Sequence, residues 1–419
     1  MSDRRGKLKF VVVFALVFML GVSLGKGLDN VLASSDSIYS DLELFTNALN
    51  IIRDNYVEDV DTRDIIYGAI DGMVSSLDAH SAFFRPGDYK EFMEDTKGSF
   101  GGLGIEISVV DGVLTIISPL EDTPAWEAGL KAGDKILFIE DESTEGMTAF
   151  DAVKVLRGPK GSQVTITIQS EGETTTRDVT ITRDIIEIQS VKYEIYEDNT
   201  AYIRITSFQE RTALDLREAL DAITDETDGN ITGIILDLRN DPGGLLSKSV
   251  DVSDMFLSEG IIVSINGKDP NNNAIFSAHR EGTIPDLPMV VLVNGGSASA
   301  SEIVAGALKD NGRAILIGTT TFGKGSVQTI IPMKDGSGLK ITTALYYTPS
   351  GASIHEIGIE PDIEVTFPDP AEVSENGDEA AEEEPASEDE TADEEPVDVQ
   401  LEKAKEVIAH WSSYEYLLK

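Results

Sequence analysis

The sequence predicts a multidomain chain with a mixed α/β core, a helical N-terminal arm and an apolar segment at its start. Strand-like and helix-like stretches alternate between residues 185 and 318, which is typical of α/β layer structures. Residues 37–96 carry apolar side chains at helical spacing, whereas residues 98–182 place β-branched side chains between glycine turns. A length of 419 residues allows two or three such domains, each with a substantial core.

Residues 1–28 combine a basic start with an apolar run. The run extends from Phe10 to Leu24, and the basic residues before it are Arg4, Arg5, Lys7 and Lys9. The length of the apolar run and the basic residues before it favour an uncleaved membrane anchor. A signal peptide is less favoured, because the residues up to Ala33 match a signal-peptidase cleavage site poorly. The basic flank stays inside, so we expect a single-pass protein of the cell membrane with its catalytic part outside the cytoplasm. Cleavage of the segment would instead make the protein secreted.

The arm at residues 36–97 is predicted to be helical. Leu42, Phe45, Leu49 and Ile52 recur at spacings of three and four, which predicts a helix that packs through this stripe. His80 follows in the stretch LDAHSAFF, and we interpret it as a structural polar residue near a turn.

Residues 98–183 form the β-rich part of the chain. Its loop Gly101-Gly102-Leu103-Gly104-Ile105 precedes a strand, and glycines there would let backbone N–H groups approach an anionic group closely. An ordinary glycine turn would have the same sequence. Thr148 is expected to open a helix from Ala149 to Leu156.

Residues 184–367 are predicted to form the α/β core. The expected strands are Ile185–Tyr196, Thr200–Ile205 and Ile231–Leu238, and the expected helices are Leu214–Ala222 and Leu245–Phe256. Asp241-Pro242-Gly243-Gly244 joins the last strand to the last helix. Such a turn leaves backbone N–H groups unpaired, as an oxyanion hole requires, but a plain strand-to-helix turn has the same pattern.

The stretch from Pro288 to Gln328 contains a candidate nucleophile and base. A strand (Met289–Val293), a helix (Ser301–Lys309) and a second strand (Ala314–Gly318) are expected, with Ser299 before the helix and Lys324 in a glycine loop. Lysine can deprotonate a serine only if burial lowers its pKa.

Two other interpretations of this stretch compete with catalysis. Ser299 and Glu302 also fit a capping box, which the spacing alone favours. A phosphate-binding loop at residues 318–324 is disfavoured, because Gly325 replaces the magnesium-binding Ser or Thr and a β-branched run follows.

The C-terminal part contains an acidic segment and a helix. Half of the 30 residues from Asp369 to Asp398 are Asp or Glu, so residues 368–398 are expected to be a disordered linker. Residues 399–419 return to helical periodicity, with Ile408, Trp411 and Leu417 or Leu418 as apolar anchors. We expect this helix to dock on a partner or on another subunit.

Composition excludes several classes of function. A net charge of −42 argues against nucleic acid as a partner. The absence of cysteine excludes thiol catalysis and disulfides, and the four histidines form no H-E-x-x-H zinc motif. We therefore predict no metal and no cofactor.

The stretch GSASASEIVAGALKDNGRAILIGTTTFGKGSVQ resembles the core of the carboxy-terminal processing peptidases, which are tail-specific Ser/Lys proteases. IILDLRNDPGGLL and TALYYTPSGASIHEIGIEPDIEV are also family-like. The resemblance implies Ser299 as nucleophile, Lys324 as general base and Gln328 as the residue that positions the lysine. Departures from the family pattern occur at Ala79, Ala352 and His355, away from these three residues.

The resemblance extends to the rest of the chain. It implies a serine protease core with an inserted PDZ domain at residues 98–183, where Gly102, Leu103, Gly104 and Ile105 would bind a peptide's terminal carboxylate. Gly243, Gly244 and Ala300 would supply the oxyanion donors. Arg157 ends the helix at residues 149–156 at a family-like position. It either stabilises the helix C-terminus as a cation or is a regulatory residue that reaches the core and senses a filled groove. The helical arm would also mediate self-association into a homodimer, to which the C-terminal helix could contribute.

The implied activity is that of an exported serine endopeptidase. It would cleave unfolded or flexible proteins near apolar C-termini, with the tail held by the PDZ domain. The alternatives are a catalytically silent PDZ adaptor that binds protein C-termini and, as a third interpretation, a nucleotide-binding protein.

Overall fold

The computed structural model describes residues 38–418, apart from residues 121, 171–172, 271–272 and 367–396. The predicted anchor at residues 1–28 and most of the acidic linker lie outside the described residues. Among the helices of the described part, none has both the length and the apolar character that a membrane span requires. The chain divides into two compact units, residues 1–83 and residues 84–419, which are described separately.

The first unit is helical where it is described. A helix covers residues 38–55, and α2 (Thr62–Ser75) and the start of β1 (Ala82–Phe84) follow. Asp61 caps α2 by accepting a hydrogen bond from the Arg63 N–H at 2.6 Å. The apolar stripe of the helix at residues 38–55 is exposed rather than packed, since Leu42 and Phe45 keep 54% and 43% of their surface.

The second unit begins with α3 (Pro86–Lys97) and a β-rich module. Two short strands, β2 (Ser99–Gly102) and β9 (Asp184–Glu187), pair antiparallel at the two ends of this module. Between them lies a sheet in the order β3-β4-β5-β7-β8, with β6 paired to β5. The elements are β3 (Ile105–Val110), β4 (Val113–Pro119), α4 (Pro124–Glu127), β5 (Lys135–Ile139), β6 (Glu142–Ser143), α5 (Ala149–Leu156), β7 (Gln163–Gln169) and β8 (Arg177–Thr182).

The α5 helix has the predicted bounds, and Thr148 opens it with a capping box to Asp151. Its buried residues Ala152 and Leu156 pack into the apolar core of the module with Leu103, Ile136 and Ile166. Since β3 lies at one end of the strand order, one of its edges is free among the described strands.

The α/β core is a six-stranded sheet in the order β10-β11-β12-β15-β16-β19. All neighbouring strands run parallel except the β10–β11 pair. The strands are β10 (Val191–Ile195), β11 (Thr200–Ile205), β12 (Gly233–Asp237), β15 (Met289–Val293), β16 (Ile315–Gly318) and β19 (Ile363–Glu364). The predicted strand at residues 185–196 is therefore two strands, β9 and β10, which belong to different sheets.

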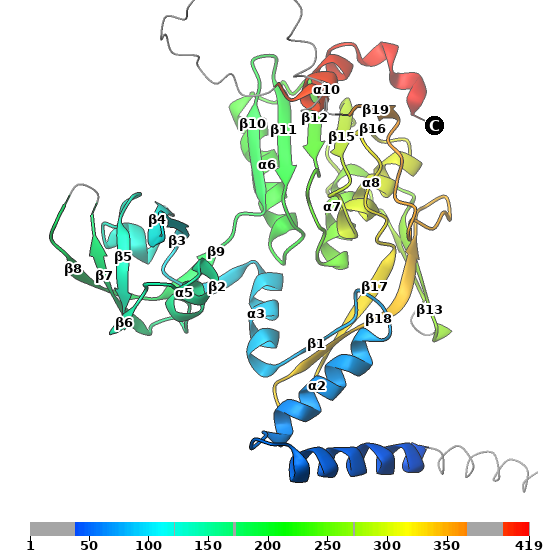
Figure 1. Ribbon diagram of the computed structural model, residues 1–419. Helices are drawn as coiled ribbons and strands as arrows, with labels where there is room; N and C mark the ends of the chain where they lie inside the picture. Colours follow the sequence, from blue (N-terminus) through cyan, green and yellow to red (C-terminus); the bar gives the residue numbers. More distant parts are fainter. Residues whose placement is uncertain (1–37, 121, 171–172, 271–272, 367–396, 419) are drawn as a thin grey trace, which may run out of the picture. The chain divides into compact units, whose positions relative to one another are not determined.

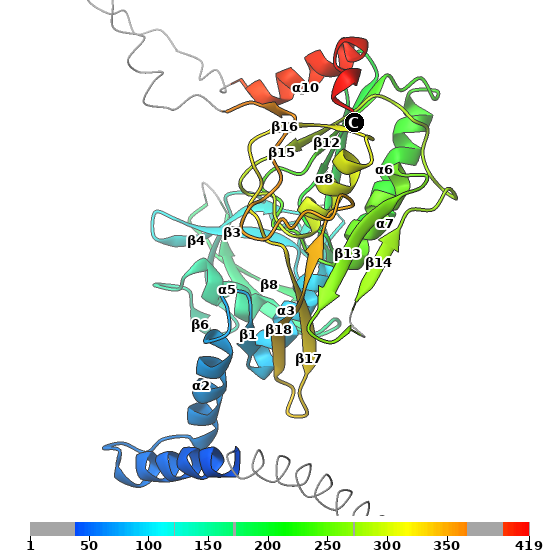
Figure 2. The same ribbon diagram turned by 90° about the vertical axis from the view of Figure 1, so that its right-hand side faces the viewer.

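Helices cover both faces of this sheet (Figures 1 and 2). α6 (Thr212–Glu226), α7 (Leu246–Phe256) and α8 (Ala300–Asp310) share one apolar cluster with Val291, whereas α10 (Val399–Ala409) shares another with Val290. Successive strand residues point to opposite faces, so a strand covered on both sides is apolar throughout. All five residues of β15 are buried, as its unbroken apolar sequence predicts.

The C-terminal helix was predicted to dock on a partner or another subunit, but it docks on the chain's own sheet. Ala404 and Val407 of α10 are fully buried against this sheet, and Trp411 and Leu417 pack beside them in the 3₁₀ turns that follow. Asp398 caps α10 and forms an ion pair with Arg239 at 2.8 Å, so the described end of the predicted linker belongs to the helix.

A second sheet brings a long hairpin beside the core. β17 (Ser326–Pro332) and β18 (Gly338–Tyr347) pair antiparallel, and β18 also pairs with β13 (Ile261–Gly267), which pairs with β14 (Ala274–Ser277). β17 starts two residues after Lys324. A strand follows Lys324 where a phosphate loop would need a helix, so the structure does not support the nucleotide interpretation.

Candidate active site

A cavity of about 540 Å³ contains the predicted nucleophile and base. Ser299, Lys324 and Gln328 all line it, although the first lies before α8, the second in a loop and the third on β17. Gly243 and Gly244 line it from the turn between β12 and α7. The fold therefore brings the predicted protease residues to one site.

Ser299 lies at the entrance to α8 in an unusual backbone conformation. Its φ is 56° and its ψ is −111°, a combination that costs a residue with a side chain about 1–3 kcal/mol. The Ser299 N–H donates to the Glu302 carboxylate at 2.8 Å, and the Ser299 carbonyl accepts from the Ile303 N–H at 3.0 Å. The predicted contact to Glu302 is thus present, and it holds the backbone of the candidate nucleophile in its strained conformation.

Lys324 is half-buried, and its surroundings favour the neutral amine that a base requires. Its Nζ atom has no hydrogen-bond partner among the described residues, so it is not hydrogen-bonded to Ser299. Burial lowers the pKa of Lys324, the positive charge of Lys340 lowers it further, and the Glu302 carboxylate acts in the opposite direction. Catalytic hydrogen bonds are often long before substrate binds, so an open dyad is compatible with catalysis.

Glu302 connects the two residues, and its full role was missed by sequence reasoning. Its fully buried carboxylate accepts hydrogen bonds from the Ser299 N–H (2.8 Å), the Lys324 N–H (2.9 Å), the Gly323 N–H (2.7 Å) and the Thr321 hydroxyl (2.6 Å). The capping-box spacing indicated the first of these contacts only. One carboxylate therefore ties the backbone of the candidate nucleophile to the backbone of the candidate base.

The predicted oxyanion donors differ in availability. The Gly243 N–H donates to the Asp241 carboxylate at 2.8 Å, so in this structure it is not free for a ligand. The N–H groups of Gly244 and Ala300 have no partner among the described residues. Gly243 is required for close approach, because a Cβ there would lie 2.6 Å from the Ala298 carbonyl oxygen and 2.8 Å from the Ala300 nitrogen.

Asp241 is itself an unusual group beside this turn. Burial raises its pKa to about 7, although the hydrogen bond from Gly243 acts in the opposite direction. One of its carboxylate oxygens has no hydrogen-bond partner among the described residues. The Asp241 carbonyl accepts from Ser301 and Ala298, which joins the turn to the start of α8.

Gln328 does not contact Lys324 in this structure. Its side-chain amide donates to the Ser326 hydroxyl at 2.9 Å and to Thr342 at 3.3 Å. It lines the same cavity, so a change of side-chain rotamer would be needed before it could position the lysine.

The predicted carboxylate loop of the β-rich module has free donors. The N–H groups of Leu103 and Gly104 have no partner among the described residues, while their carbonyls accept from Ala125 and Leu120 at 2.9 and 2.8 Å. Gly104 has φ +79°, and a Cβ there would lie 2.3 Å from Thr123. The carbonyls of Leu103 and Gly104 are thus occupied by hydrogen bonds within the module, whereas their two N–H groups remain available to an anion. Gly102 and Ile105 end and begin the flanking strands.

Arg157 follows α5 and contacts α3 rather than the α/β core. Its guanidinium lies 3.7 Å from Glu91 and 3.6 Å from Asp95, and over the ring of Phe100. Asp95 also lines the Ser299 cavity. The predicted contact with the core is therefore indirect and passes through α3.

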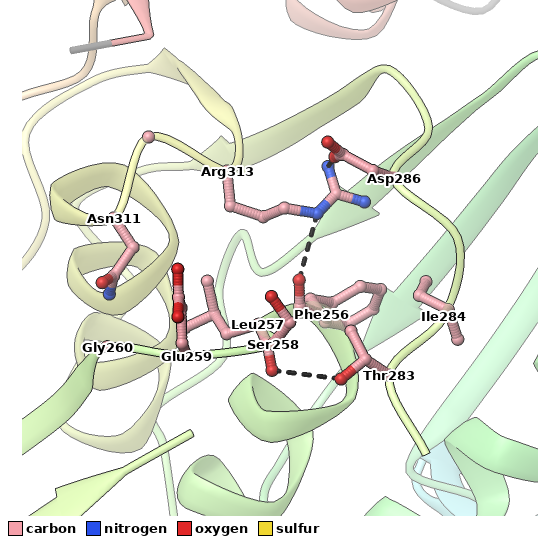
Figure 3. A pocket seen from close by; sticks show the side chains of 11 residues that line it. Phe256, Leu257, Ser258, Glu259, Gly260, Thr283, Ile284, Asp286, Asn311 and Arg313 are labelled. Atoms are coloured by element: carbon pink, nitrogen blue, oxygen red, sulfur yellow. Dashed lines mark hydrogen bonds and ion pairs between the residues drawn. The ribbon is translucent and has the colours of Figure 1, made fainter. Parts of the chain in front are cut away.

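A cavity of about 620 Å³ lies elsewhere, at the end of α7 (Figure 3). Arg313 lies in it and donates to the carbonyls of Phe256 and Leu287 at 3.1 and 2.8 Å, so this guanidinium caps the carboxyl end of α7. Thr283 and Ser258 offer hydroxyls there, but no lysine or histidine lines the cavity. Its chemistry does not match a serine nucleophile with a base.

Comparisons with known proteins match three parts of the chain to family models. The model of peptidase family S41 matches residues 199–365, a PDZ domain model matches residues 115–170, and the model of the activating protease CtpB N-terminal domain matches residues 25–84. The segment that contains all the candidate catalytic residues thus lies within the peptidase match.

The chain is also similar to curated proteases over most of its length. It is 44% identical to a carboxy-terminal-processing protease of Bartonella bacilliformis over 86% of this chain and 83% of that protein, and 35% identical to the carboxy-terminal processing protease CtpA of Bacillus subtilis over 88% and 79%. A solved structure titled photosystem II D1 C-terminal processing protease is 30% identical, with a TM-score of 0.45, and covers 77% of this chain and 92% of that one. The identity with the two curated proteases and the family-model matches show that the chain belongs to the carboxy-terminal processing proteases, serine peptidases of family S41 with a PDZ domain.

Proposed function

We propose that this protease is an exported endopeptidase that cleaves flexible proteins near their C-termini and is held at the membrane by residues 1–28. The observation that carries the proposal is the single cavity in which Ser299, Lys324 and the Gly243-Gly244 turn meet. The basic and apolar start of the chain supports export, and the free N–H groups of Leu103 and Gly104 support capture of a tail.

The mechanism follows from the groups in the cavity. Neutral Lys324 accepts the Ser299 proton as the hydroxyl attacks the scissile carbonyl, and it then gives that proton to the leaving amine. Gly244 and Ala300 donate to the oxyanion from their free N–H groups. Water then releases the acyl group, with Lys324 again as base. Gln328 would orient the lysine after its amide leaves Ser326.

The PDZ domain binds peptide C-termini, and we assign this task to two features of its surface. The terminal carboxylate is held by the N–H groups of Leu103 and Gly104, between Gly102 and Ile105. The rest of the tail pairs with the free edge of β3 as an additional strand, opposite α5. The adaptor alternative is disfavoured, because an adaptor has no need of a half-buried lysine with a lowered pKa beside a strained serine.

The first prediction concerns regulation by tail binding. A peptide with an apolar C-terminus is expected to stimulate cleavage of a separate short internal peptide in the wild type, because a ligand favours the state that binds it better. Arg157→Ala should remove this stimulation, because it breaks the contact with Glu91 and Asp95 that links the groove to the cavity. The measurement is the cleavage rate with and without the stimulating peptide.

The control peptide for this assay has an amidated C-terminus, which removes the carboxylate that Leu103 and Gly104 would hold. Stimulation by the amidated peptide would contradict carboxylate capture. Full stimulation of the Arg157→Ala variant would exclude Arg157 from the coupling.

The second prediction concerns pH. Because the base must be neutral, activity should rise with pH through the lowered pKa of Lys324 and then level off. Removing the neighbouring charge with Lys340→Met should raise the pKa of Lys324, so the midpoint of the pH–rate profile should move to higher pH. Lys334→Met, an exposed lysine of the same hairpin, serves as the control. A midpoint that moves equally in both variants, or in neither, would contradict the role of Lys340.

A further inference from the structure

Tyr346 places one hydroxyl between the candidate nucleophile and base. It lies on β18, is only 2% exposed, and reaches the cavity wall. Its hydroxyl contacts the Ser299 carbonyl oxygen at 3.0 Å and also the Lys324 carbonyl oxygen. Its backbone N–H donates to the Gly325 carbonyl at 3.0 Å, so main chain and side chain both hold the Lys324 loop.

These two carbonyls decide where the reacting side chains point. A peptide plane held at its oxygen fixes the backbone torsion beside it, and this torsion sets the direction of the side chain. Ser299 needs such support because its backbone is strained. Lys324 needs it because residues 319–325 form no helix or strand that would set its direction.

Tyr346 complements Glu302 in this arrangement. Glu302 accepts from the N–H groups of Ser299 and Lys324, and the single O–H proton of Tyr346 is shared between their two carbonyl oxygens. All four backbone groups of the two residues are thus held by two buried side chains from different elements, α8 and β18.

We infer that Tyr346 is a positioning residue, whose shared hydroxyl sets the distance and orientation between the Ser299 hydroxyl and the Lys324 amine. This inference rests on the proposed roles of Ser299 and Lys324. The tyrosine does not take part in proton transfer, since its hydroxyl faces the two carbonyls rather than a reacting atom.

The hydroxyl keeps its proton under the conditions in which the enzyme needs it. Burial raises the pKa of Tyr346 well above its usual range, and the Glu302 charge raises it further. The other charged or titratable groups described around Ser299 and Lys324 are Lys340, Glu302 and Asp95, with Asp241 behind the Gly243 turn. Tyr346 therefore remains a donor at the alkaline pH at which Lys324 is neutral.

The experiment is Tyr346→Phe, which keeps the buried ring and removes only the hydroxyl. We expect kcat to fall by roughly 10- to 100-fold, as a displacement of about 1 Å at a reacting group would cause, with KM changed less than about twofold. Tyr347→Phe, at the next position of the same strand, should match the wild type in both constants. The thermal unfolding midpoint and the affinity of the PDZ domain for a C-terminal peptide show whether each variant is folded.

Each outcome separates the inference from the assignment on which it rests. A Tyr346→Phe enzyme with wild-type kcat would overturn the inference. So would a loss of kcat accompanied by an equal loss of peptide affinity and a large fall in the unfolding midpoint, because the hydroxyl would then serve only the fold. Cleavage retained by Ser299→Ala would instead overturn the site assignment, whatever Tyr346→Phe does.

Discussion

Ser299→Ala and Lys324→Ala should each reduce cleavage of an unfolded protein with an apolar C-terminus by several orders of magnitude. The first change removes the attacking oxygen, and the second removes one of the two lysines that line the cavity among the described residues, the other being Lys340. Neither change should unfold the protein, because Glu302 and Tyr346 hold these residues through backbone atoms. The measurements are the cleavage rate and the thermal unfolding midpoint.

The control for the lysine variant is Lys334→Ala, which removes an exposed lysine of the β17–β18 hairpin and should leave the rate unchanged. Near-normal turnover by Lys324→Ala would show that another group is the base, with Lys340 the first to test. If the Ser299→Ala enzyme were fully active, Ser299 would not be the nucleophile and this cavity would not be the active site.

Local pattern was sufficient to predict much of the fold. The strand Met289–Val293 and the helix Ala149–Leu156 have the predicted bounds, because each is set by neighbouring residues: an unbroken apolar run in the first case and a capping box in the second. The stretch at residues 185–196 was predicted as one strand. Its two halves join different sheets, and the break at residues 188–190 contains no glycine or proline that would indicate it.

The residue types of the candidate site could be proposed from the sequence, but the hydrogen bonds that hold Ser299 and Lys324 in place could not. Ser299 and Lys324 were proposed from a family resemblance, because the spacing alone favoured a helix cap formed by Ser299 and Glu302. The contacts of Glu302 to Gly323 and Lys324, and those of Tyr346 to both carbonyls, cross 21 to 47 positions of sequence. Such contacts depend on how β18 returns to the core, and no local pattern in a single sequence contains this information.

Glu302→Gln should have a large effect on both stability and activity. The carboxylate uses one oxygen for Thr321 and Gly323 and the other for Ser299 and Lys324. An amide has only one oxygen, so its NH₂ group must face at least one backbone N–H that no longer has an acceptor. Each buried donor left unpaired costs about 1–3 kcal/mol, and we expect a loss of roughly 2–4 kcal/mol in the free energy of unfolding. Denaturant unfolding measures this loss, with the exposed Glu360→Gln as control.

The pH–rate profile of the Glu302→Gln enzyme should also test whether Lys324 is the titrating base, because the charge of Glu302 affects the pKa of Lys324. The Glu302 charge raises the pKa of Lys324 against burial and the repulsion of Lys340. Removing that charge should therefore lower the pKa and move the midpoint of the pH–rate profile to lower pH, opposite to the shift expected for Lys340→Met. A structural disturbance that did not depend on charge would not move the midpoints of the two variants, Glu302→Gln and Lys340→Met, in opposite directions. Shifts of the same sign would show that the titrating group is not an amine placed between these two charges.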